Sequence, residues 1–209
     1  TSNQHFGGDV LLTGGVLYAT SGDRRCRACA QSPERYNGKV LRFQIQPDAG
    51  LLAHPQNTVN TDSRREIYSL GHRNPQGIDV VSEFGEVVVS EHGPQGGDEV
   101  NVLQLGTNYG WPLVTLGEEY GGGLIGETQL PGYQDSVTHY IPSIAPRGIK
   151  YIHENQLFPE LDNSFLITSL KFELMLVLSL DSIRPRHRFI NLSGYGRISS
   201  FDINSVGEI

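Results

Sequence analysis

Short runs in which apolar and polar residues alternate, set off by turns that contain glycine, recur along the whole chain. The runs GGVLYATS and KVLRFQI have the period of half-buried strands. Gly14-Gly15 opens the first run and Asn37-Gly38 precedes the second, and such pairs adopt positive φ at little cost. The same rhythm returns over residues 77–91, 147–180 and 197–209. The sequence therefore predicts an all-β protein in which each repeat supplies two or three strands of one sheet.

The composition excludes two kinds of partner. The 209 residues are 37% hydrophobic and 19% charged, which is ordinary for a globular protein with a sizeable core. No run of about eighteen apolar residues occurs, so we expect no membrane span. The formal net charge of -7 argues against nucleic acid, because phosphate binding needs a basic face.

The polar residues best suited to bind a ligand or take part in catalysis lie in two glycine-rich loops, at residues 71–77 and 91–99. The first loop crowds four side chains that form hydrogen bonds around one proline, which is more than a turn needs: His72, Arg73, Asn74 and Gln76.

In the second loop, Gly93 and Pro94 leave backbone carbonyls without bulky cover, and Asp98 and Glu99 follow. Mixed carboxylate and carbonyl oxygens are what calcium prefers, so this loop predicts a calcium site. The alternative at this point is that both loops are surface turns with solvated charges.

Three motifs in a fixed order carry a resemblance to a known family. GHRNPQG, SEHGPQGGDE and NYGWP resemble the soluble pyrroloquinoline quinone (PQQ) dependent glucose and aldose sugar dehydrogenases, which are six-bladed β-propellers. The resemblance implies oxidation of the C1 hydroxyl of an aldose sugar to a lactone, with hydride transfer to PQQ, calcium as a second cofactor, and an external electron acceptor.

Six blades of about 40 to 50 residues need a longer chain than this one. The resemblance therefore implies that residues 1–209 form a single, partial propeller domain with about four blades. An unclosed propeller exposes strand edges, so we expect poor solubility if these residues are produced alone. The family is typically exported, which implies a periplasmic or secreted location.

The resemblance also assigns catalytic positions. His5 matches the general base that removes the C1 hydroxyl proton, and Asp23 matches the carboxylate that fixes its tautomer. Arg73 matches a permanent charge that stabilises the oxyanion formed on the quinone. Without the resemblance, a histidine such as His5 is usually a solvated loop residue.

The cofactor positions implied by the resemblance are Arg73, Asn74, Lys171 and Arg197. The sequence departs from the family here, because the second arginine of an R-x-R-D motif is replaced by Ser199. Losing one charge-assisted pair would weaken PQQ binding by about tenfold or more. Taken alone, Arg73 would be a loop-anchoring residue and Lys171 a surface lysine.

The resemblance implies two kinds of calcium site. One holds the ion that lies against PQQ, through the carbonyls of Gly93 and Pro94. The other is structural and uses the positions Asp98, Glu99, Tyr109, Thr115, Gly117 and Glu119. Trp111, the only tryptophan, is interpreted as a structural residue of the NYGWP turn.

Two alternatives to the dehydrogenase remain. One is a non-catalytic propeller in which calcium stabilises the fold and which binds a protein or glycan. The presence of Ser199 in place of an arginine favours this alternative. The other is a propeller lactonase or hydrolase that uses calcium to bind a substrate carbonyl, against which Lys171 and Arg197 count. For Cys26 and Cys29, a local disulfide is preferred to free thiols or a zinc site.

Overall fold

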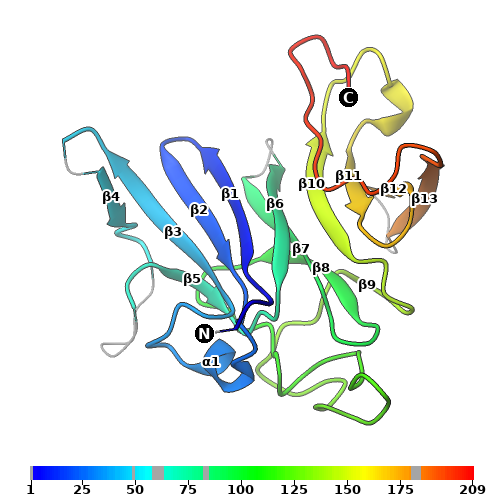
Figure 1. The fold of residues 1–209 in the computed structure, drawn as a ribbon. Helices are drawn as coiled ribbons and strands as arrows, with labels where there is room; N and C mark the ends of the chain where they lie inside the picture. The colour runs from blue at the N-terminus through cyan, green and yellow to red at the C-terminus, as the bar shows by residue number, and fades with distance from the viewer. Residues whose placement is uncertain (1, 49, 58–63, 82–84, 180–184) are drawn as a thin grey trace.

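The computed structural model describes residues 2–48, 50–57, 64–81, 85–179 and 185–209. The chain forms three antiparallel sheets that follow one another in sequence and fan out side by side (Figure 1). Their innermost strands, β1, β6 and β10, pack against one another in that order. This is the arrangement of consecutive propeller blades, so the predicted fold class is confirmed.

The first sheet has the strand order β1-β2-β3-β4, and β5 also pairs with β3. A short helix, α1, lies between β2 and β3. The bounds of these elements are β1 Gly7–Thr13, β2 Val16–Ser21, α1 Arg27–Gln31, β3 Lys39–Gln46, β4 Gly50–Ala53 and β5 Ile67–Leu70.

The other two sheets each have four strands, in sequence order. The second contains β6 Pro75–Val81, β7 Glu86–Glu91, β8 Asp98–Leu103 and β9 Thr138–Tyr140. The third contains β10 Pro146–Ile152, β11 Ser164–Ser169, β12 Leu174–Ser179 and β13 Arg186–Asn191, with the 3-10 turn η1 Pro159–Leu161 between β10 and β11.

The middle sheet is buried on both faces. Val87 and Val89 of β7 belong to the cluster shared with the first sheet, whereas Val88 belongs to the cluster shared with the third. Successive side chains of a strand point to opposite faces. An uninterrupted valine run is therefore stable here, because each face packs against a neighbouring sheet.

The C-terminal segment departs from the prediction. Residues 197–209, expected to supply strands, form none, and the described residues contain three sheets where about four blades were expected. Phe201 and Ile203 instead pack on the cluster of the third sheet. Within the described ranges, no helix is long and apolar enough to cross a membrane.

Candidate active site

A cleft of about 1230 Å³ opens at the sheet edge where β1, β6 and β10 begin and β2, β7 and β11 end. Loops from all three sheets meet there, which brings together residues far apart in the sequence. Nine predicted site residues line the cleft: His5, Asp23, Arg73, Asn74, Gly93, Pro94, Asp98, Glu119 and Lys171.

His5 and Asp23 form a close pair in this cleft. His5 Nδ1 lies 2.7 Å from Asp23 Oδ1, and the carboxylate is fully buried. His5 has a φ of 55°, a left-handed conformation that non-glycine residues adopt rarely and often at functional sites. A side chain at Gly22 would collide with the His5 carbonyl, so this glycine permits the close approach of the two loops.

Asp23 stays ionised in spite of its burial. Burial alone would raise the pKa of the carboxyl, but hydrogen bonds from His5, the Arg25 amide and Trp111 outweigh it and lower the pKa. The amide of Arg25 donates to Oδ1 at 2.7 Å and the indole of Trp111 to Oδ2 at 2.8 Å. A carboxylate held in this way fixes the orientation of the imidazole.

Arg73 is a buried cation without a carboxylate partner among the described residues. It is 6% exposed, one terminal nitrogen donates to the His92 carbonyl at 3.1 Å, and Nε has no hydrogen-bond partner in the described part of the chain. Burial lowers the pKa of Arg73. A desolvated guanidinium on a cleft wall suits an anionic or electron-rich ligand.

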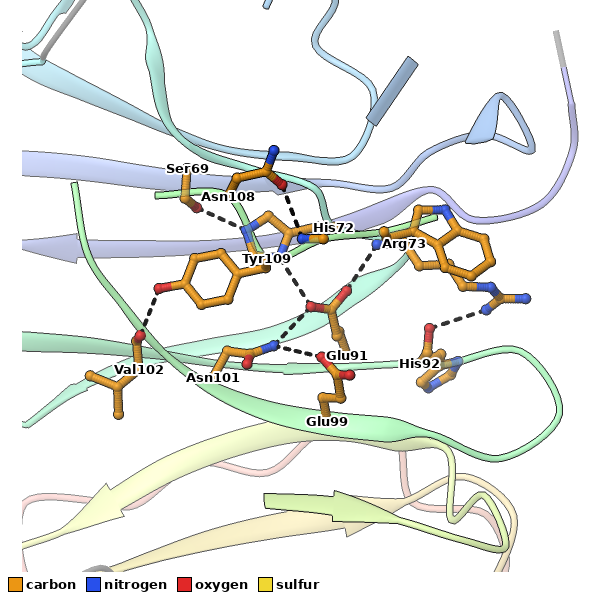
Figure 2. Close-up of polar contacts among 12 residues, drawn as sticks. Ser69, His72, Arg73, Glu91, His92, Glu99, Asn101, Val102, Asn108 and Tyr109 are labelled. Atoms are coloured by element: carbon orange, nitrogen blue, oxygen red, sulfur yellow. Dashed lines mark hydrogen bonds and ion pairs between the residues drawn. The ribbon is translucent and has the colours of Figure 1, made fainter. Parts of the chain in front are cut away.

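A network beneath the cleft holds the backbone of Arg73 (Figure 2). Glu91 accepts hydrogen bonds from His72 Nδ1 at 3.0 Å, the Arg73 amide at 2.9 Å and Asn101 Nδ2 at 3.0 Å. Nε2 of His72 lies 2.8 Å from Ser69 Oγ. The hydrogen-bonded series Ser69–His72–Glu91 is similar to the catalytic triad of serine hydrolases. Because Ser69 and His72 are both 0% exposed, a substrate cannot reach them, and the network instead positions the loop.

The second loop is held by Asp98. Its carboxylate accepts from the amides of Gly93, Ile144 and Ala145 at 2.9, 2.8 and 2.7 Å, and from Ser143 Oγ at 3.2 Å. In the described part of the chain, no hydrogen bond is found to the carbonyl oxygens of Gly93 or Pro94. Unsatisfied carbonyls beside a cleft suit a hard cation.

A separate cavity of about 10 Å³ lies behind this loop, lined among others by Glu91, Glu99, Tyr109 and Thr115. Burial, and then the charge of Glu91, raise the pKa of Glu99 to about 8. A cation in this cavity would remove that penalty, so these residues fit calcium chemically.

Of the six positions predicted for the structural calcium, Glu99, Tyr109 and Thr115 line this cavity, whereas Asp98, Gly117 and Glu119 do not. Asp98 is saturated by the donors named above, and Gly117 packs against the ring of Pro94. Glu119 forms a bidentate ion pair with Arg27 at the cleft. Among the described residues, no three His, Cys, Asp or Glu side chains cluster as a metal site. A calcium ion would therefore rely largely on backbone oxygens.

The structure does not bring Arg197 to the cleft. Its side chain is exposed and is not among the lining residues, because the segment after β13 forms no strand that would carry it there. Lys171, directly after β11, does reach the cleft.

Sequence reasoning missed several residues that line the cleft. They include Arg25, Gln76, His92 and Tyr120. Gln76 and His92 lie inside the two predicted loops, and Gln76 was among the polar side chains noted there, but neither was assigned a role. Arg25 and Tyr120 gave no signal. Cys26 and Cys29 form the preferred local disulfide.

The chain is similar to proteins of one known family. The sequence model of the Glucose / Sorbosone dehydrogenase family matches residues 1–208. Aldose sugar dehydrogenase YliI of Escherichia coli is 33% identical over 186 residues, which is 87% of this chain and 49% of that protein. The chain thus spans about half the length of this relative.

Solved structures give the same result. The apo-form soluble aldose sugar dehydrogenase of Escherichia coli superposes with a TM-score of 0.87 and 30% identity, over 99% of this chain and 60% of that one. A PQQ-bound aldose sugar dehydrogenase of Streptomyces coelicolor gives 0.73 and 27%, over 95% and 53%. With the predicted motifs placed around one cleft and the family model matched along almost the whole chain, the chain belongs to the glucose/sorbosone dehydrogenase family.

Proposed function

We propose that the full-length protein is a PQQ-dependent dehydrogenase that oxidises the C1 hydroxyl of an aldose sugar to a lactone. The observation that carries the proposal is that the His5–Asp23 pair and the buried Arg73 line the same cleft. The pair removes a proton, and the guanidinium stabilises negative charge. Oxidation of an alcohol needs both functions.

The position of Asp23 determines which nitrogen of His5 accepts the proton. Because Asp23 binds Nδ1, that nitrogen carries hydrogen and Nε2 keeps its lone pair. Nε2 therefore takes the C1 hydroxyl proton. The resulting imidazolium is stabilised by the carboxylate, as in other histidine–aspartate pairs.

When bound, PQQ would supply the acceptor for the hydride of C1. Arg73 and Asn74 would contact its quinone oxygens and Lys171 an anionic group, while the carbonyls of Gly93 and Pro94 would hold calcium against it. Glu99, Tyr109 and Thr115 would hold a structural calcium. Arg197 lies outside the cleft in the structure, so the binding of PQQ rests on the other residues.

An external electron acceptor would reoxidise the cofactor after each turnover. We also propose export to the periplasm or the exterior. The disulfide between Cys26 and Cys29 supports this location, because disulfides persist mainly in oxidising compartments.

The test is calorimetric titration of PQQ into the calcium-loaded, full-length protein. We expect micromolar or tighter binding, at least about tenfold weaker in an Arg73→Ala, Lys171→Ala double variant. The matched control is Lys150→Ala, Arg188→Ala, which removes two cations outside the cleft lining. Binding should also weaken after chelation of calcium.

A positive titration leads to a screen of aldoses with an artificial electron acceptor. A folded, calcium-loaded protein without PQQ binding would contradict the proposal. That outcome would favour the non-catalytic propeller that binds a protein or glycan.

A further inference from the structure

Trp111 is a buried residue that contacts two residues of the cleft lining, Asp23 and Arg73, although its sequence context indicated only a turn. It is 4% exposed. Its indole nitrogen donates to Asp23 Oδ2 at 2.8 Å, across 88 residues of sequence. Its ring lies 5.3 Å from the guanidinium carbon of Arg73 and 5.4 Å from that of Arg27, within the range of cation–π contacts.

The two oxygens of Asp23 have different partners. Oδ1 forms hydrogen bonds with His5 Nδ1 and with the Arg25 amide, both at 2.7 Å. Oδ2 receives one hydrogen bond among the described residues, that of the Trp111 indole. A buried carboxylate oxygen without a donor is costly, so this bond satisfies Oδ2 and helps to hold the carboxylate in its present orientation.

The backbone of Trp111 is itself fixed to two loops of the site. Its amide donates to the Gly71 carbonyl at 2.9 Å, and its carbonyl accepts from Gln31 Nε2 at 2.7 Å. The first contact reaches the loop that carries Arg73, and the second reaches α1, which follows Asp23. The indole therefore has little freedom to move away from either group.

We infer that Trp111 is a positioning residue that holds Asp23 toward His5 and, through its ring, holds Arg73 at the cleft. The geometric part of this inference is independent of the reaction. The catalytic consequence rests on the proposed function.

The test uses Trp111→Phe, which keeps an aromatic ring but removes the indole N–H. Without that donor the negative state of the His5–Asp23 pair is less stable, so the apparent pKa of the pair should rise by about one pH unit. Other charged groups near the pair are Arg24, Arg25, Arg27, Arg73 and His92, and the substitution leaves all of them in the chain.

The readout is histidine-selective ¹⁵N NMR titration of the full-length protein without PQQ, with the His5 signal assigned by His5→Gln. The matched control is Tyr68→Phe, which keeps an aromatic ring but removes a polar group from a side chain that is 8% exposed in another part of the core. This control should leave the titration of His5 unchanged. Thermal unfolding would first show that the Trp111→Phe variant is folded. An unchanged His5 titration in that folded variant would overturn the inference.

Steady-state kinetics then test the catalytic consequence. We expect kcat to fall about tenfold or more, with little change in KM and with the acid limb of the pH profile moved to higher pH. A shifted His5 titration in a protein whose wild type neither binds PQQ nor oxidises sugars would support the positioning role and refute the proposed function. A shifted titration with wild-type kcat would refute the catalytic consequence.

Discussion

At the scale of single residues, the chemistry of the site depends on charges that are buried and nevertheless retained. Asp23 and Arg73 are both almost inaccessible to solvent. Asp23 is stabilised by hydrogen bonds from three residues, whereas Arg73 has an incomplete set. The saturated group is therefore suited to hold another side chain, and the unsaturated group is suited to bind a ligand.

The retained charge of Asp23 predicts a pH dependence of stability. Its pKa in the folded state lies below the ordinary value of 3.8, so the carboxylate contributes stability above that pH and loses it as the pH falls through the folded pKa. Asp23→Asn should be less stable than the wild type near neutral pH, and the difference should shrink below about pH 4.

Urea unfolding of the full-length protein from neutral to acid pH would measure this difference. Asp202→Asn, an exposed carboxylate 3.6 Å from Lys150, is the control and should change little. A difference between Asp23→Asn and wild type that stays constant with pH would contradict the prediction.

At the scale of elements, α1 and the disulfide segment are attached to the first sheet by Lys39. This side chain is 0% exposed, and its ammonium donates to the carbonyls of Cys29, Ala30 and Asn37 at 2.9, 2.8 and 2.8 Å. The last carbonyls of a helix need such partners. Lys39 therefore fixes the segment that carries Arg25 and Arg27 to the cleft.

Lys39→Met should destabilise the protein by about 1 to 3 kcal/mol, because methionine fills the space but donates no hydrogen bond. The carbonyls of Cys29 and Ala30 keep the backbone amides of Ser32 and Gly71 as donors, whereas the Asn37 carbonyl loses its one donor among the described residues. Burial lowers the pKa of Lys39 to about 7, below its unfolded value of 10.5. The folded state then binds fewer protons between these values, so wild-type stability rises with pH there relative to the variant.

Denaturant unfolding at several pH values tests both statements. Lys150→Met, at a lysine that is 38% exposed, is the matched control and should be nearly neutral. A Lys39→Met variant as stable as this control would show that the buried lysine does not anchor the segment.

At the scale of the whole molecule, an inner strand of the first sheet presents an uncovered apolar face. Val10 and Leu12 of β1 are 64% and 63% exposed. In a propeller, the face of an inner strand normally packs against a neighbouring blade. Because the family relatives are longer than this chain, we expect this face to be covered in the full-length protein.

Residues 1–209 produced alone should therefore aggregate, and Val10→Thr, Leu12→Thr should raise their solubility. The same double substitution should destabilise the full-length protein. Leu157→Thr, Val206→Thr, at side chains 52% and 64% exposed, is the control. Light scattering and thermal unfolding give the two readouts, and equal effects of both pairs would argue against a covered face on β1.

Local patterns in the sequence were sufficient to predict strands, turns and the two polar loops. Alternation and glycine turns depend on residues that are neighbours in the sequence, and β-branched residues such as Val87 to Val89 favour a strand. The motifs likewise identified His5, Asp23 and Arg73 as residues of one site.

Only the tertiary structure decided how these parts meet. It joined Trp111 to Asp23, paired Glu119 with Arg27, and left Arg197 outside the cleft. Contacts across some 90 residues depend on how the sheets pack and on which donors their loops then present. No periodicity along the chain encodes that packing, so the sequence alone could name the candidate residues but could not assign all their partners.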